Sequence, residues 1–398
     1  MKFKVNEIIL FFLLIIWGTN LPTFIYYVIF ILVFILALYQ IVKYRKKIKF
    51  SQNEDYIALS FVLIWGYGII NGMLHENNMN YIVANFAGMI CYIMYFIFTT
   101  LKLDKNRIIK IVFISGLSVS LIVVLRIVCF FINISNPIVN SIIGEGVGMS
   151  STGQVRVYFT TLASAYPLLG ASLFILLYQY RKIDILRIDK ISLALLYFIL
   201  TVSSIMFFAS SKGFLLGALF IILYLPFFIS VKSLLIGRLN KALFILLVIA
   251  LIILAFLLYF DYFSIIEMMF AREDESNSLR YEQLTYMLKD ITFWGKGLGA
   301  TVPGIVRSEE GPYGFELTYI NLLHKFGVFA LVLFFNWIYM FIKLAFFMIK
   351  KKSLFYSSVA LSSLGYMFPS IGNPLLMHPS LVILNCLTLY LLRIENGK

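Results

Sequence analysis

Several cations of this 398-residue chain lie singly, at the ends of apolar runs or in the loops between them, instead of in basic clusters. They are Arg126, Arg156, Lys212, Arg272, Arg280, Lys289, Lys296, Arg307 and Lys325. A guanidinium group pairs with phosphate oxygens in a two-pronged fashion, whereas a lysine ammonium acts as a point charge. Cations that gather at one depth therefore form a site for an anion, and a lipid pyrophosphate is an anion that itself sits in a membrane.

Five of these cations are candidate pyrophosphate ligands: Arg126, Arg156, Lys212, Arg280 and Lys325. Lys212 lies in the tight turn FFASSKGFLLG between two apolar runs. A charged side chain is not expected there without a role, so a functional role is favoured. Arg126 lies near the end of an apolar run. A long side chain there can also snorkel to the membrane interface, and this structural role remains an alternative.

Glu316 is the candidate general base, or the group that orients an acceptor hydroxyl beside these cations. It opens the segment FELTYINLLHKFG, in which Glu316 and Ile320 are one helical turn apart. The alternative is an acid that caps a helix N-terminus, where a carboxylate is stabilised. His324 and Lys325 lie about two turns further on and could serve instead. The candidate catalytic residues are thus Glu316, Arg280 and His324.

Other classes of chemistry find no support in the residue pattern. The three histidines show no metal-ligand spacing, and no nucleophile-elbow, Walker or dinucleotide-binding pattern occurs. The three cysteines lie inside apolar runs, where packing is their expected role. The sequence predicts no metal site, no cofactor and no disulfide.

The elements that position these residues belong to a membrane protein. Hydrophobic residues make up 61% of the chain and charged residues 13%, far from the balance of soluble domains. The net charge of +14 is carried mostly by short basic clusters between apolar runs. That placement is typical of topology determinants, so nucleic acid is not an expected partner.

A span needs about 20 apolar residues, and this length divides the chain into about twelve helices in a single transmembrane domain. The fold expected is an all-α, polytopic membrane protein. The predicted spans are 6–19, 22–42, 56–73, 81–101, 108–132, 157–178, 191–210, 213–231, 242–260, 316–342, 354–371 and 376–393.

Seven basic clusters, holding 24 of the 33 lysines and arginines, fall on one side when these spans are threaded in order. Both termini are therefore expected in the cytoplasm. No Asp or Glu is predicted near the middle of a span, which argues against a proton- or sodium-coupled transporter.

Two large segments remain on the outer face. Residues 135–156 are rich in small and polar residues and predict an irregular, re-entrant loop. Residues 261–315 form the larger loop, and Asp261 to Tyr313 hold nine of the nineteen acidic residues of the chain. Within it, NSLRYEQLTYMLKD predicts a short amphipathic helix capped by Ser278 that ends before the turn-rich WGKGLG.

Four local patterns resemble the O-antigen polymerase and O-antigen ligase superfamily of bacterial envelope glycan assembly. SSKGFLLG is similar to the family's Ser-Arg-Gly step, with Lys212 in place of Arg. RYEQLTYMLKDITFWGKGLG resembles its Arg-containing loop helix and Gly-x-Gly turn, with Arg280 at the Arg position. The segment from Glu316 to Gly327 resembles the next helix, and PSIGNPLL resembles an Asn-Pro element of polymerases.

The resemblance implies a metal-independent glycosyltransferase of the inner membrane whose active site faces outward. Its substrates would be polyprenyl-diphosphate-linked oligosaccharides, and a chain-length regulator protein would be a partner. It also implies that Arg156 helps to hold the donor pyrophosphate. Glu316 stands where ligases keep His, which favours a polymerase. A ligase is the alternative on the same fold, and a flippase or other multispan transporter is the alternative from another class.

Overall fold

The computed structural model describes residues 50–101, 103–132, 147–149, 155–157, 164–178, 191–205, 212–239, 275–305, 312–350 and 354–397, with scattered positions at 28–43, 248 and 251. Nearly all of these residues are helical, as an all-α protein requires. The other described residues form a two-stranded antiparallel ribbon or lie in turns and loops, among them residues 291–305.

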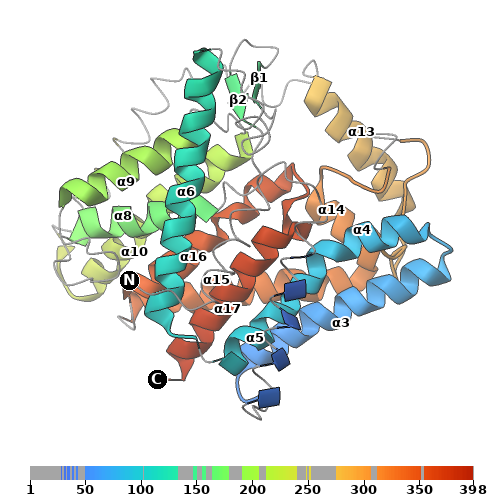
Figure 1. Ribbon diagram of the computed structural model, residues 1–398, viewed down its shortest axis with the longest axis horizontal. Helices are drawn as coiled ribbons and strands as arrows, with labels where there is room; N and C mark the ends of the chain where they lie inside the picture. Colours follow the sequence, from blue (N-terminus) through green and yellow to red (C-terminus); the bar gives the residue numbers. More distant parts are fainter. Residues whose placement is uncertain are drawn as a thin grey trace.

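The elements of the first half are α3 (Asn53–Leu74), α4 (Met79–Met89), η1 (Ile90–Tyr92), α5 (Ile93–Leu101), α6 (Lys105–Phe131), β1 (Val147–Met149), β2 (Val155–Val157), α8 (Tyr166–Tyr178), α9 (Ile191–Ser203) and α10 (Lys212–Leu235) (Figure 1). The second half contains α13 (Glu275–Asp290), α14 (Thr318–Phe326), η4 (Gly327–Phe329), α15 (Ala330–Ile349), α16 (Leu354–Ser363), η5 (Leu364–Met367), η6 (Pro369–Ile371), η7 (Leu375–Met377) and α17 (Pro379–Asn396).

Five helical stretches among the described residues are long and apolar enough to cross a membrane: Asn53–Leu74, Met79–Thr100, Lys105–Phe131, Gly213–Leu235 and Thr318–Ile349. Each coincides with one predicted span. Two shorter apolar helices fall in the predicted sixth and seventh spans. The predicted spans 6–19, 22–42 and 242–260 lie largely or wholly outside the described residues, so the total of twelve stays a prediction.

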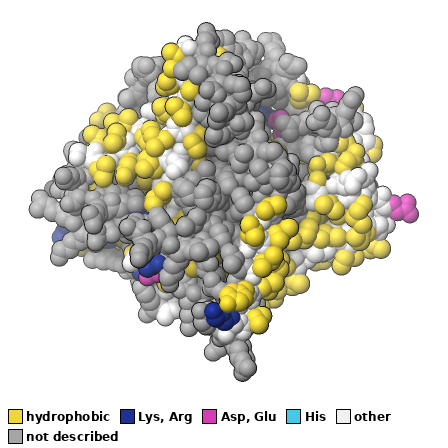
Figure 2. Space-filling model, viewed as in Figure 1, with side chains coloured by type: hydrophobic (Ala, Val, Ile, Leu, Met, Phe, Trp, Pro, Cys, Tyr) yellow, Lys and Arg dark blue, Asp and Glu magenta, His cyan; other side chains and the backbone are white. Residues whose placement is uncertain are grey.

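Large apolar side chains are exposed along these helices, as lipid contact requires. Figure 2 shows them gathered over the face where α3 and α4 lie in Figure 1. Leu63 and Ile70 of α3 and Phe335 of α15 are more than half exposed. In water such a continuous apolar surface would be a liability, whereas hydrocarbon solvates it.

The sixth predicted span begins later than expected. Val157, its predicted first residue, ends strand β2, and Arg156 pairs with Gly148 across the ribbon. The predicted irregular loop 135–156 therefore contains β1 and most of β2. Alternating β-branched residues in VRV favour a strand, and a short apolar run does not distinguish a strand from a helix.

The eleventh predicted span, 354–371, is also not a continuous α-helix. It is made of α16 followed by the two 3₁₀ turns η5 and η6. Pro369 accounts for part of this break, because a proline removes a backbone donor and clashes with a preceding helical turn. The result is a segment of short 3₁₀ turns, residues 364–378, which joins α16 to α17.

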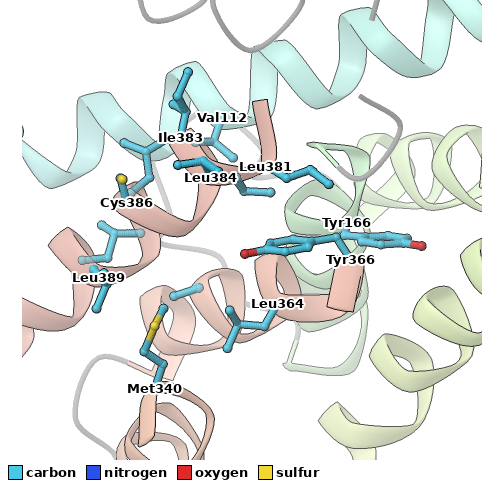
Figure 3. Packing of buried hydrophobic residues seen from close by; sticks show 14 of the residues in the cluster. Val112, Tyr166, Met340, Leu364, Tyr366, Leu381, Ile383, Leu384, Cys386 and Leu389 are labelled. Atoms are coloured by element: carbon cyan, nitrogen blue, oxygen red, sulfur yellow. The ribbon is translucent and has the colours of Figure 1, made fainter. Parts of the chain in front are cut away.

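The core is built where α17 packs against α5, α6, α15 and α16. Figure 3 shows Leu381, Ile383 and Leu384 of α17 near Val112 of α6, with Tyr366 of η5 in the same layer. Tyr166 of α8 donates its hydroxyl to the carbonyl oxygen of Phe214 in α10 at 2.9 Å. This bond fixes the start of α10 against α8.

One end of the described helices is closed by ion pairs and hydrogen bonds, and we call it the Arg393 end. Arg393 of α17 binds Asp55 in the first turn of α3 at 2.8 Å, and Tyr95 also donates to Asp55. Lys105 pairs with Glu395 at 3.1 Å. All of these residues lie in or beside segments that the predicted threading places on one side of the membrane.

The opposite end carries a tight loop, residues 292–299, which we call the glycine loop. Gly295, Gly297 and Gly299 all have positive φ angles near +75°, a conformation that glycine adopts without strain. The amide of Asn77 donates to the carbonyl oxygens of Lys296 and Leu298, each at 2.8 Å.

The glycine loop also bonds two helices through its backbone. Leu298 N donates to Gly68 O of α3 at 2.8 Å. The amides of Lys296 and Gly297 donate to the carbonyl oxygens of His324 and Lys325 at 2.8 and 2.9 Å. The last carbonyls of α14, which have no partner within the helix, are thereby satisfied.

We expect Gly72→Ala to destabilise the protein, because a Cβ at Gly72 would lie 2.4 Å from the carbonyl oxygen of Leu298. Forcing the two backbones apart should cost about 1–3 kcal/mol. The matched control is Gly66→Ala on the same helix, where no atom lies within 4 Å of the added carbon. Unfolding in detergent measures both, and equal stabilities would contradict this packing.

Candidate functional site

Arg280 and Glu316, two of the predicted catalytic residues, form an ion pair. Arg280 Nε lies 2.8 Å from Glu316 Oε2, and their side chains are 30% and 19% exposed. The two Nη groups of Arg280, with four N–H donors, make no hydrogen bond to a described residue. The guanidinium is thus held by one edge, and its Nη edge is available to an anion.

Both partners are placed by their helices. Arg280 lies in the second turn of α13, which begins at Glu275 instead of at the predicted cap Ser278. Gln283, three residues further along, is buried and accepts a hydrogen bond from the backbone N–H of Glu316 at 3.1 Å. Helix α14 begins at Thr318, so Glu316 precedes the helix instead of opening it as predicted.

The segment PSIGNP packs between α14 and Arg280. The hydroxyls of Thr318 and Tyr319 donate to the carbonyl oxygens of Asn373 and Met367, the latter at 2.8 Å. A Cβ added to Gly372 would lie 3.5 Å from Arg280 Nε. The backbone of Gly372 therefore lies directly beside the guanidinium.

The same segment reaches the start of α10, where Lys212 is the first residue. A Cβ at Gly213 would lie 2.6 Å from the Cα of Pro369, so the two backbones are in close contact. The position of the Lys212 side chain lies outside the description. The chain segments of three predicted patterns are nevertheless neighbours, in the order Gly213, Pro369, Gly372 and Arg280.

A second charged cluster surrounds His324. Its Nε2 lies 2.8 Å from Asp290 Oδ2, and Lys296 Nζ lies 3.3 Å from Asp290 Oδ1. His324 is fully buried, and its ring lies edge-on to Phe315. Asp290, the last residue of α13, thus ties that helix to α14 and to the glycine loop.

Lys325 is also fully buried. Its ammonium lies 3.2 Å from the carbonyl oxygen of Tyr313 and 3.4 Å from that of Ala300. These two carbonyls belong to the segments on either side of residues 306–311. Lys325 thus joins two described segments of the outer loop to α14. Its predicted role as a pyrophosphate ligand stays a prediction.

Arg126 and Arg156, two further predicted pyrophosphate ligands, lie in α6 and in β2. Arg126 is 2% exposed in α6, so its side chain is buried in protein instead of snorkelling outward. Arg156 lies in β2, and the ribbon packs beside the upper end of α6 in Figure 1.

Several residues that build the site were not predicted: Asn71, Asn77, Gln283, Asp290 and Gly372. Asn71 donates to the carbonyl oxygen of Gly295 at 2.9 Å, so it anchors the glycine loop to α3 as Asn77 does. The sequence signal for this role was a run of amide side chains, NGMLHENNMN, at the end of a span. Amides placed there can satisfy loop carbonyls that water does not reach.

No protein-family model matches the chain, and no curated protein matches it.

The Asp290–His324 contact should contribute measurably to stability. Asp290→Ala leaves the buried His324 ring without its partner, and His324→Ala removes a buried side chain that Asp290 binds. Each change should lower the free energy of unfolding by about 1–3 kcal/mol. In a double-mutant cycle the two losses should not add.

The matched control is Glu282→Ala on the exposed face of the same helix, which should change stability by about 0.5 kcal/mol or less. Unfolding in detergent measures the four variants. Strict additivity of Asp290→Ala and His324→Ala would contradict the contact.

Proposed function

We propose that the protein is a polysaccharide polymerase of O-antigen or capsule type, acting at the outer face of the cytoplasmic membrane. It transfers a growing glycan from one polyprenyl diphosphate carrier to the sugar of an incoming lipid-linked repeat unit. Both termini lie in the cytoplasm, and the Arg280–Glu316 pair faces outward. A chain-length regulator protein is a proposed partner.

The chemistry is a displacement at the anomeric carbon of the donor sugar. The acceptor hydroxyl oxygen forms a bond to that carbon, the bond from the carbon to the diphosphate oxygen breaks, and the hydroxyl proton passes to Glu316. Polyprenyl diphosphate leaves with the electron pair. Arg280 stabilises the charge that develops on the leaving group, with Lys212 and Arg156 as further ligands.

The Arg280–Glu316 ion pair gives this scheme an order of events. A diphosphate binds the Nη edge of Arg280 and competes with Glu316 for the guanidinium. Its binding draws positive charge away from Glu316 and weakens the ion pair, and the Glu316 carboxylate then accepts a proton from the acceptor. Donor binding thereby prepares the base, and the base stays neutralised while the site is empty.

One observation carries the proposal: residues from separate sequence patterns meet at one place. Arg280 binds Glu316 at 2.8 Å, and Gly372 of the Asn-Pro segment lies beside the same guanidinium. These residues are far apart in the chain, so their convergence is not a consequence of local structure. Arg126, Lys325 and His324 are assigned supporting roles in this proposal, because all three are buried.

In cells that lack the native gene, Arg280→Ala and Glu316→Gln should abolish long glycan chains. Loss of a positioned acid–base group typically lowers a rate by about 10²-fold or more. The product should be capped single repeat units, seen as loss of the ladder on a polysaccharide gel.

Glu282→Ala is the matched control for that assay, because Glu282 lies exposed on α13 two residues from Arg280. It should give a full ladder. Full-length chains from both Arg280→Ala and Glu316→Gln would refute the assignment. A strain with no surface glycan at all, not even single units, would indicate a ligase.

Competition at Arg280 can be measured without turnover. Glu316→Gln should bind inorganic pyrophosphate more tightly than the parent protein, by on the order of tenfold, because the competing charge is gone. Arg280→Ala should bind it more weakly. Isothermal titration in detergent measures both, and weaker binding by Glu316→Gln would mean that the carboxylate positions Arg280 instead of competing for it.

A further inference from the structure

Two large aromatic side chains stand exposed at the tip of the glycine loop. Phe293 is 66% exposed and Trp294 is 58% exposed. Their rings lie edge to face, with centroids 4.8 Å apart. Neither residue belongs to the Arg280–Glu316 pair or to the Asp290 cluster, so the proposed function does not account for them.

The backbone beneath these rings is firmly held. The carbonyl oxygen of Trp294 accepts the hydroxyl of Tyr67 at 2.7 Å, and that of Phe293 accepts the N–H of Val328 at 2.9 Å. The next residue, Gly295, accepts the amide of Asn71. The loop backbone is thus bonded to α3 on one side and to η4 on the other. These bonds keep the two rings on the outside of the loop.

The aromatic pair adjoins the apolar surface of the spans. Phe329 of η4, just before α15, contacts both the aromatic pair and α3. Its ring centroid lies 6.0 Å from that of Trp294 and 4.6 Å from that of Tyr67 in α3. Next to these residues, the last turns of α3 expose Ile70, Met73 and Leu74. The first turns of α15 expose Leu331 and Phe335. Exposed apolar residues thus lie on α3 and on α15, and the loop tip is in ring contact with residues at the end of each.

We infer that Phe293 and Trp294 are a membrane anchor that inserts into the headgroup boundary of the leaflet at this end of the spans. Aromatic rings, and tryptophan above all, favour that boundary because they combine an apolar body with a polar edge. The loop that follows Asp290 is thereby held at a fixed depth. The polar groups behind it, Asp290 and Lys296, are held there too.

The depth of Trp294 can be measured by fluorescence in proteoliposomes. The parent protein and Trp294→Phe are each reconstituted in phosphatidylcholine brominated either near the headgroup or near the end of the acyl chains. The difference between the two proteins isolates the emission of Trp294, since the other three tryptophans are common to both. Phenylalanine keeps an aromatic ring at an exposed position, and size-exclusion chromatography checks its folding.

The anchor predicts that bromines near the headgroup quench the Trp294 emission more strongly than bromines near the chain ends, and that aqueous acrylamide quenches it weakly. Strong quenching by acrylamide with none by either lipid would overturn the inference, because the tip would then lie in water. Strongest quenching by the deep bromines, or none by any quencher, would overturn it as well. If Trp294→Phe does not fold, Trp294→Tyr replaces it.

This measurement is independent of catalysis. It is made without donor or acceptor, and a failed anchor leaves the ladder and pyrophosphate assays unaffected. Conversely, loss of the proposed polymerase activity would not alter the depth of Trp294.

Discussion

The need to satisfy every backbone polar group away from water governs this structure. In hydrocarbon an unpaired N–H or C=O costs several kcal/mol, so irregular backbone at membrane depth survives only where protein groups pair with it. The glycine loop meets this need through Asn71 and Asn77 of the α3 region. The segment 364–378 meets it in part through Thr318 and Tyr319 of α14. The irregular backbone is thus fixed by hydrogen bonds to neighbouring helices, and these bonds let it position the residues of a site.

The glycine loop and the segment 364–378 bring charged residues together at two separate sites. Arg280 and Glu316 share a partly exposed place beside Gly372, whereas His324 and Lys325 point into protein. Residues in α14 and just before it therefore have different roles. Glu316 precedes the helix and can meet a ligand, while the buried pair holds α13 and the outer loop in position.

The sequence was informative wherever hydrophobicity decides the outcome. Five predicted spans match helices because about 20 apolar residues have few alternatives to a spanning helix. The predicted helices were wrong at Val157, where a strand preference outweighs the apolar pattern. They were also wrong at Pro369, where a proline interrupts an apolar run. Charge and topology placed Glu316 beside the group of candidate cations, but they did not predict its ion pair with Arg280, 36 positions away.

The structural partners of the site were harder to predict. Gly372 lies beside Arg280, and Gln283 binds the backbone of Glu316. A glycine or a glutamine in the sequence does not by itself indicate such a role. Lys325 was a candidate ligand because it lies outside the basic clusters, at the expected depth of the other single cations. Its partners are backbone carbonyls, which a sequence does not place. Contacts of this kind depend on the packing of distant segments, so they become visible only in three dimensions.

The ion pair between Asp55 and Arg393 has a consequence for biogenesis. Its partners are 338 residues apart, so Asp55 leaves the ribosome long before Arg393 exists. During synthesis the first turn of α3 must keep two acids, Glu54 and Asp55, at the edge of the bilayer without their final partners. The contact between α3 and α17 at the Arg393 end can therefore form only after α17 has been synthesised.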